Sequence, residues 1–464
     1  IALASQAGTP RGIAKNDYKT WMPRVGFSYD VTGTGKTILR GGFGTFYERI
    51  QGNDIYDAAG SAPFISTPQA NSVEFTSITS NWQTGTSASN PITIQSYNSL
   101  NPYYPHPGVA QYSLGVQHEL APALILTTQY VGNLEWHQNT WIPVNNDPLS
   151  TPPITRLEST GSWKDPLCLS TPSCVALNPA NGGSGFTSVD SQNAASYPGF
   201  GQLRQQSNVA TGSYNSLQVG LRQQSKHGLS YEIDYTWSHQ IDSTQTSVDV
   251  DNNNPTYNPW NLKYDKGSGS LDRRQVLNIN YEYKLPFFLH SSGIEKSILG
   301  GWEISGTVIA ESGLPWFGNA APKNSFGDTV GLGGDYSIRP NLTGKPHYTK
   351  ANATVGTNTG YQYVSQAGWS APVAAWDNGP NLGFGNSGKD SVVGAGRTNF
   401  TTALTKSFAF GDRAHFEFHA ESFNTFNHTQ FNSLLDSNPA NSDFGFVNGT
   451  QDPREFELGG RLVF

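Results

Sequence analysis

The sequence is poor in charge, in aliphatic side chains and in long apolar runs. Charged residues make up 14% of its 464 residues and hydrophobic residues 36%, and both shares are low for a soluble domain. No apolar run reaches the roughly 20 residues that a transmembrane helix requires. Residue types that favour helices are scarce as well. These absences exclude a helical membrane protein and argue against a helical bundle.

The charge balance and the remaining composition exclude two further classes. The 28 Lys and Arg residues are outnumbered by 35 Asp and Glu residues, which gives a net charge of −7, and they form no cluster. An acidic chain without a basic patch is not expected to bind nucleic acid. Aromatic residues reach 12%, which is too many for a disordered chain. With 50 glycines, what remains is an all-β protein with many turns.

Apolar and polar residues alternate in many segments. Between Leu229 and Ser238, large apolar side chains alternate with Ser, Glu, Asp and Thr, and a period of two is typical of a strand with one apolar face. Periodicity alone leaves two folds open, a soluble sandwich and a membrane barrel. The pattern predicts about eleven strands, near residues 21–30, 36–48, 110–120, 123–133, 212–225, 228–239, 271–285, 300–311, 397–409, 412–426 and 454–464.

The lengths of the connections separate these two folds. Short links alternate with long ones, which span residues 49–109, 134–211, 240–270, 312–396 and 427–453. Compact soluble domains rarely carry so many long loops. An outer-membrane barrel has short periplasmic turns at one rim and long extracellular loops at the other. The sequence therefore predicts an antiparallel transmembrane β-barrel in the bacterial outer membrane, with its long loops extracellular.

In such a barrel the apolar faces contact outer-membrane lipid and the polar faces line the lumen. The charged residues expected to face the lumen are Arg40, Glu232, Asp234, Glu282, Arg413, His415, Glu417, His419 and Glu421. The last four alternate along one strand, where same-face neighbours lie roughly 6.6–7 Å apart. That separation is too large for one metal ion without help from other strands, so we interpret these residues as lumen wall.

Both ends of the sequence indicate how much of a barrel the chain contains. It begins at Ile1 with no signal peptide, and about eleven strands is half of the roughly 22 found in plugged transporters. We therefore expect an N-terminally truncated half-barrel, with residues 1–20 as a truncated loop and residues 21–464 as the C-terminal half. The last strand ends in an aromatic residue, Phe464, which we expect to be the signal for the barrel assembly machinery.

Several segments resemble one family in a fixed order. They are Pro23–Asp30, Gly35–Glu48, Tyr214–Val219, Tyr235–Ser238, Asp272–Arg274, Tyr283–Phe287, Leu299–Gly306, Ala420–His428 and Asp452–Phe464. Together they resemble the barrel of TonB-dependent receptors of the Oar-like branch, which carry a carboxypeptidase-regulatory-like domain and are common in Acidobacteria. The resemblance spans residues 21–464 and is absent from the long loops.

The resemblance implies energised uptake of a large nutrient, such as an oligosaccharide, a peptide or a metal chelate. It also implies a plug, which the lumen-facing residues would contact, and a TonB box, both in an N-terminal part that this chain lacks. The TonB system would act only through that part, and the extracellular ligand is unknown. A passive porin-like or adhesive barrel without energy coupling is the alternative. No GxSxG, HExxH or Walker-type motif occurs, so neither enzyme activity nor a cofactor is expected.

The long loops hold the remaining candidates. Cys168 and Cys174 are the only cysteines, and an oxidising compartment favours a disulfide between them. Asp249 and Asp251 offer oxygen ligands for Ca²⁺, but the segment lacks the Gly and the distal Glu of an EF-hand, so this metal site is a weak candidate. Four loop aromatics are candidates for substrate contact, with loop packing as the alternative: Trp141, Trp260, Trp316 and Trp376.

Overall fold

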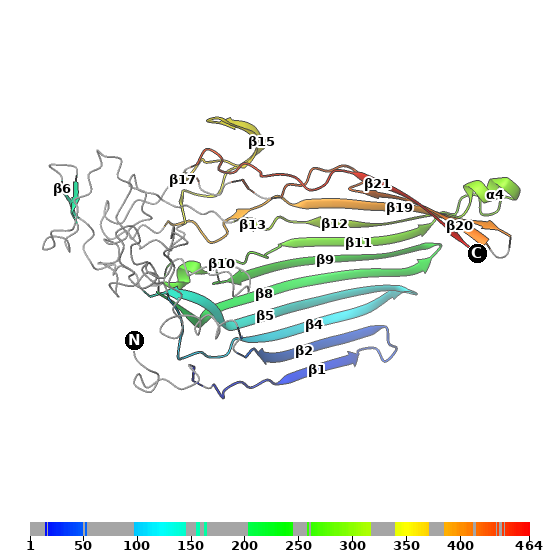
Figure 1. Cartoon of the computed structure of the whole chain (residues 1–464). Helices are drawn as coiled ribbons and strands as arrows, with labels where there is room; N and C mark the ends of the chain where they lie inside the picture. The colour runs from blue at the N-terminus through cyan, green and yellow to red at the C-terminus, as the bar shows by residue number, and fades with distance from the viewer. Residues whose placement is uncertain are drawn as a thin grey trace, which may run out of the picture.

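The computed structural model describes residues 14–49, 97–144, 203–244, 258–316, 339–370, 385–411 and 414–464, apart from short gaps within these ranges, together with residues 52, 155–157 and 162–164. Most of these residues form one 13-stranded sheet. Its main path pairs each strand antiparallel with the next along the chain (Figure 1). The path runs through β1 (Arg24–Asp30), β2 (Thr37–Tyr47), β4 (Gly108–Ala121), β5 (Leu124–Pro143), β8 (Leu203–Lys226), β9 (Leu229–Asp242), β11 (Gln275–Lys284), β12 (Trp302–Glu311), β19 (Arg397–Phe410), β20 (Ala414–Phe423) and β21 (Glu455–Val463).

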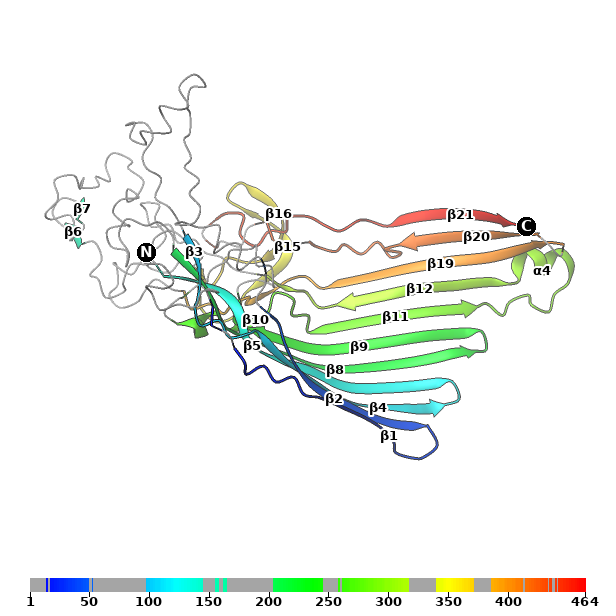
Figure 2. The same cartoon turned by 60° about the horizontal axis from the view of Figure 1, so that its bottom comes forward.

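The all-β, antiparallel fold class is confirmed, and a strand of the path lies in each range where the sequence predicts one. Two strands are much longer than predicted, because β5 continues to Pro143 and β8 already begins at Leu203. Among the described residues the sheet is open, with β1 and β21 at its two edges. The long sheet curves gently across its width (Figure 2).

Short turns join the strands at one end of the sheet, and the long connections leave from the other end (Figure 1). In the turn after β1, the Asp30 carboxylate accepts hydrogen bonds from the backbone N–H groups of Gly33 and Gly35 at 3.0 and 2.7 Å. Both glycines have a positive φ, of 69° and 75°, which glycine adopts without steric cost. The C-terminus lies at this same turn end (Figure 2).

The strand register gathers the apolar side chains on one face of the sheet. Leu114 of β4 pairs with Gly41 of β2 and with Tyr130 of β5, which in turn pairs with Leu217 of β8. Many large side chains of this face are exposed, among them Val25, Phe27, Tyr29, Phe43, Leu114, Val116, Tyr130, Leu217, Trp237, Leu404, Leu458 and Leu462. In the described part of the chain, no element covers these side chains, and a broad uncovered apolar face is what an outer-membrane barrel presents to lipid.

Small elements at the loop end form a separate packed unit, which we call the cap. Its sheets pair β13 (Pro315–Trp316) with β18 (Val392–Val393), β14 (Asn341–Leu342) with β17 (Trp369–Ser370), and β15 (Tyr348–Val355) with β16 (Asn358–Val364). Tyr363, Val364, Val392 and Phe444 form its buried core. This aromatic cluster holds together segments that are far apart in the sequence.

The remaining elements are short. They are β3 (Tyr97–Leu100), which pairs in parallel with β8, β6 (Thr155–Leu157), β7 (Ser162–Lys164), the 3₁₀ helix η4 (Leu262–Asp265), β10 (Gly267–Ser268) and the helix α4 (Gly293–Leu299). The helix α4 lies at the turn end, in the link between β11 and β12 (Figure 1). In the described part of the chain, no helix is long and apolar enough to cross a membrane.

Candidate functional site: the polar wall and its extracellular rim

The face opposite the apolar one is a polar wall, and the described lumen candidates lie on it. Glu232 of β9 pairs with Asn280 of β11, which pairs with Thr307 of β12, so the three side chains form one row. Arg40, Asp234, Glu282, His415, Glu417, His419 and Glu421 occupy the same face by register. Along β20, His415 Nε2 lies 3.1 Å from Glu417 Oε1. Arg413 lies outside the described residues.

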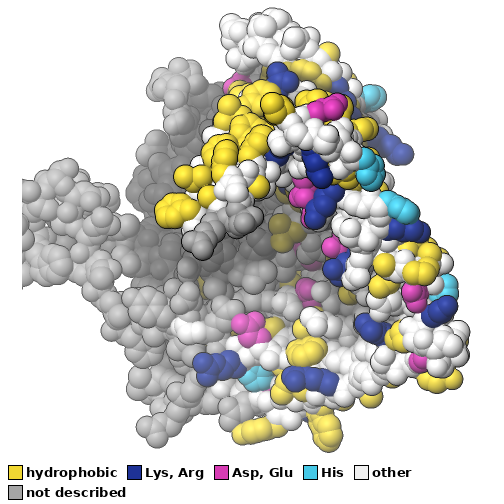
Figure 3. Space-filling model, turned by 90° about the vertical axis from the view of Figure 1, so that its right-hand side faces the viewer, with side chains coloured by type: hydrophobic (Ala, Val, Ile, Leu, Met, Phe, Trp, Pro, Cys, Tyr) yellow, Lys and Arg dark blue, Asp and Glu magenta, His cyan; other side chains and the backbone are white. Residues whose placement is uncertain are grey.

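The polar wall is hollowed where β5, β8 and β9 lie side by side. A cavity of about 390 Å³ opens there, and its polar lining includes Gln129, Gln218, Arg222, Glu232 and Asp234. Gln129 donates to Gln218 across the β5–β8 pair at 2.6 Å. Seen from the turn end, acidic and basic side chains lie along the inner side of the curved wall (Figure 3). The wall therefore offers amides and charges of both signs to whatever fills the hollow.

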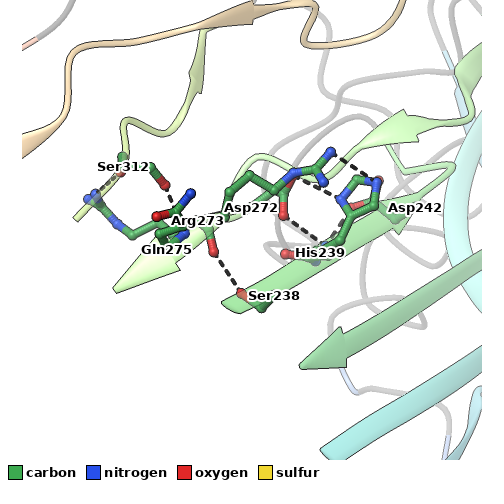
Figure 4. A network of polar contacts seen from close by, with 9 residues as sticks. Ser238, His239, Asp242, Asp272, Arg273, Gln275 and Ser312 are labelled. Carbon is green, nitrogen blue, oxygen red and sulfur yellow. Dashed lines mark hydrogen bonds and ion pairs between the residues drawn. The ribbon is translucent and has the colours of Figure 1, made fainter. Parts of the chain in front are cut away.

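At the loop end of the wall, a cluster of charged side chains joins neighbouring strands, and we call it the rim cluster. Its centre is Asp272, whose side chain is 3% exposed. The Asp272 carboxylate accepts hydrogen bonds from Arg274 Nε at 2.8 Å and from the backbone N–H of Gln240 at 2.8 Å, and it lies 3.0 Å from His239 Nδ1 (Figure 4). One carboxylate thus ties the end of β9 to the segment before β11.

The same cluster continues across the next two strands. The Glu311 carboxylate at the end of β12 is 3.2 Å from Arg273 Nε and 2.6 Å from Arg397 Nη2. Arg273 also donates to the carbonyl oxygen of Ser312 at 2.9 Å, and Ser238 donates to the Arg273 carbonyl at 2.6 Å (Figure 4). Charge-assisted bonds of this kind are the stronger hydrogen bonds in proteins, so they fix the strand ends of β9, β11, β12 and β19 relative to one another.

Polar contacts join the cap to the loop end of the sheet beside the rim cluster. Lys389, almost fully buried, donates to Asp242 Oδ1 and to the carbonyl oxygen of Thr244. Arg339 donates to the carbonyl oxygen of Tyr264 at 2.6 Å and its guanidinium lies 3.5 Å from the centre of the Tyr264 ring. Tyr264 also donates its hydroxyl to the carbonyl oxygen of Gly385 at 2.7 Å, so two buried cations and a neutral hydrogen bond hold the cap against the end of β9 and the β9–β11 connection.

Replacing Asp272 by Asn should weaken the rim measurably. Asn keeps the size of the side chain but removes the charge that Arg274 and His239 face, and bonds to charged groups are worth about 1.5–3 kcal/mol. We therefore expect the free energy of unfolding, measured by urea titration in lipid vesicles, to fall by about 2 kcal/mol. The matched control is Asp452→Asn, at an exposed position. Equal stability of the two variants would contradict this role of Asp272.

Several sequence candidates lie outside the described residues: Cys168, Cys174, Asp249, Asp251, Trp260 and Trp376. Two of the four aromatic candidates are described. Trp141 lies within β5 and is 4% exposed, and Trp316 packs edge-on against Tyr363 at a centroid distance of 5.1 Å. Both rings contact protein, so substrate contact stays a prediction for them. In the described part of the chain, no group of three His, Cys, Asp or Glu side chains is placed to hold a metal ion.

Comparison with known families decides the class. A profile described as outer membrane beta barrel domain matches residues 1–457. The chain belongs to this family. Its place is accordingly the bacterial outer membrane. No characterised protein matches its sequence significantly.

Among solved structures, the similar ones include one outer-membrane transporter and two receptors. The transporter YddB from Escherichia coli matches with a TM-score of 0.46 and 8% identity, over 94% of this chain and 39% of that chain. The ferric enterobactin receptor PfeA from Pseudomonas aeruginosa gives 0.41 and 10%, over 96% and 40%. The siderophore receptor PirA from Acinetobacter baumannii gives 0.39 and 10%, over 96% and 41%. The chain thus spans about two fifths of the length of these proteins.

The rim cluster was not predicted as a site from the sequence. The segment Asp272–Arg274 was visible as part of the family resemblance, but its partners are dispersed. Asp242 and Lys389 are 147 residues apart, and Glu311 meets Arg397 only because β12 pairs with β19. The sequence signal that could have indicated the cluster is the position of these residues, because charged side chains lie at the loop-side ends of four predicted strands.

Proposed function

We propose that the chain forms the barrel wall of a TonB-dependent receptor of the Oar-like branch, which takes up a large nutrient such as an oligosaccharide, a peptide or a metal chelate. The observation that carries the proposal is the polar wall. It is a long concave face with amides and charges of both signs, hollowed at β5, β8 and β9, and opposite to an apolar face. A lumen lined by these side chains suits a large polar cargo and a polar plug. It does not suit a dry apolar core.

The wall also leaves room for a plug near β1 and β2. Gly26 of β1 pairs with Gly42 of β2, and Gly42 pairs with Ser113 of β4. A Cβ atom added at Gly42 would meet no atom closer than 3.7 Å, so the glycines do not merely relieve crowding within the sheet. Strand glycines commonly mark places where another backbone approaches closely. We assign that approach to the plug of the complete protein.

The other partners follow from the same arrangement. The apolar face would contact outer-membrane lipid, and β21 with Phe464 would be recognised by the barrel assembly machinery. Coupling to TonB would be made by a segment outside these 464 residues. The proposal includes no enzyme activity, cofactor or nucleic-acid partner.

Growth of a deletion strain tests the proposal. The strain is grown with single members of a panel of oligosaccharides, peptides and ferric siderophores as the only source of carbon, nitrogen or iron. We expect loss of growth on one class, restored by the complete gene, and the same loss when TonB is deleted instead. A growth defect that is indifferent to TonB would contradict energised uptake.

A swelling assay addresses the passive alternative directly. The complete protein is reconstituted in liposomes, and arabinose and raffinose are added outside. A plugged receptor should give no swelling above that of empty liposomes, whereas an open pore admits small sugars at once. Swelling with both sugars would replace the receptor proposal with a porin.

A further inference from the structure

The helix α4 is unusual because almost all of its surface is exposed, including its apolar side chains. It has seven residues, and none of them is buried. Ile294 is 77% exposed and Ile298 is 53% exposed, and since they are four residues apart they lie on the same side of the helix. Further exposed apolar side chains in the same link are Phe287, Phe288, Leu289 and Leu299. An isolated helix this short is not stable in water, so its contacts with the sheet must hold it.

Those contacts place α4 on the apolar side of the sheet. Trp302 pairs with Lys406 and Lys406 with Phe418, and by alternation this row shares a face with Ile304, Leu404 and Ala420. The Trp302 indole Nε1 donates to the carbonyl oxygen of Ile298 at 3.0 Å. Lys406 Nζ donates to the same carbonyl at 3.1 Å and also to the carbonyl of Gly300. Side chains of the apolar face therefore cap the C-terminal end of α4.

The contacts at the C-terminal end of α4 explain a cation on an otherwise apolar face. Lys406 is 5% exposed, and its ammonium lies 4.9 Å from the Phe408 ring centre and 5.3 Å from that of Trp302. A cation at a helix C-terminus meets carbonyl groups that have no partner within the helix. The charge is thereby satisfied by the helix, and the apolar residues of α4 remain directed to the surroundings.

We propose that residues 286–299 form an interfacial anchor in the periplasmic leaflet of the outer membrane, with Ile294 and Ile298 immersed among the phospholipid chains near their headgroups. Three observations carry this inference. The segment lies at the end of the short turns (Figure 2), it is attached to the face that continues as the exposed apolar surface, and its own apolar side chains are uncovered. Amphipathic helices lie at such boundaries with the apolar face buried about 5–10 Å into the region between headgroups and acyl chains.

The inference rests on the lipid-facing assignment of the apolar face, and spin labels can test the two separately. The complete protein, with Cys168→Ser and Cys174→Ser as background, receives one nitroxide at Ile294→Cys or Ile298→Cys. It is reconstituted in vesicles of phosphatidylethanolamine and phosphatidylglycerol. Leu114→Cys, in the middle of the apolar face, is the lipid control, and Thr34→Cys, in the polar turn between β1 and β2, is the water control. Each label is probed with oxygen, which collects in lipid, and with a water-soluble nickel chelate.

The expected result is high oxygen collision at positions 294 and 298, with nickel collision at least about fivefold below that at position 34, as for a side chain beneath the headgroups. Nickel collision equal to that at position 34 would overturn the anchor. So would shielding from both reagents, since that result means burial against protein. If the label at Leu114 is also accessible to nickel, the lipid-facing assignment of the apolar face is wrong. That result would contradict the proposed function and not the anchor alone.

Discussion

Replacing Lys389 by Met should loosen the cap from the sheet by about 3 kcal/mol, because removing one partner of a buried ion pair leaves the other charge uncompensated. The Lys389 side chain is 1% exposed, and its ammonium is bonded to the Asp242 carboxylate and to the Thr244 carbonyl. Methionine has nearly the same length but cannot donate a hydrogen bond. The segment 385–396 would then open about a hundredfold more often, since 1.4 kcal/mol is a factor of ten. Hydrogen exchange of that segment in lipid vesicles measures the opening directly.

Two further variants make this result specific. Lys345→Met changes the same side chain at an exposed position of the cap, where substitutions typically change stability by less than about 0.5 kcal/mol. The double variant Lys389→Met with Asp242→Asn also removes the Asp242 carboxylate that Lys389 contacts, so part of the loss should be recovered, as expected for residues in contact. Exchange in Lys389→Met that matches Lys345→Met would show that the ion pair does not hold the cap.

Replacing Asp390 by Asn should stabilise the cap above pH 6. Burial raises the pKa of the Asp390 carboxyl from 3.8 to about 6, and Asp242 adds to the rise while Lys389 and Arg339 oppose it. Below about pH 4 the group is protonated whether the cap is folded or not, so it costs nothing. Between pH 4 and 6 the unfolded form ionises while the folded form does not, and stability falls. Above pH 6 the full cost applies, about 3 kcal/mol for a shift of two units.

The Asp390→Asn variant removes that cost and its pH dependence. The backbone at Asp390 has a positive φ of 50°, a conformation that Asn tolerates well, so the exchange introduces no strain. Hydrogen exchange of the cap, corrected for the intrinsic rate at each pH, should show a decline between pH 4 and 6 in the natural protein and a flat profile in the variant. A decline of equal size in both would assign the pH dependence to another group.

The strands could be predicted because their periodicity is local. In β9 and β11, each polar residue between two apolar ones marks the face it occupies, and the register then follows from short turns such as the one after Asp30. The extensions of β5 and β8 were not predicted, and the reason is also local. Register shifts interrupt the pairing between Glu135 and Gln138, and His137 has a positive φ, so the alternation breaks there.

The rim and the cap could not be predicted, because their contacts join distant segments. Val392 meets Tyr363 and Phe444 only because two long connections, β12–β19 and β20–β21, return to the same end of the sheet. Lys406 is a single charge on an apolar face, and its carbonyl acceptors lie about a hundred residues away at the end of α4. In both cases the residue types are ordinary, and only the topology brings them together.

The length of β8 sets how far the protein reaches out of the cell. A tilted strand crosses the hydrocarbon layer in about 9–11 residues, and β8 has 24. The remaining residues, at about 3.3 Å each and at a tilt of about 45°, carry the paired strands roughly 30 Å beyond the bilayer. The paired strands β5 and β8 therefore project well beyond the membrane surface. A solute arriving from the medium therefore meets this protein well before it meets lipid.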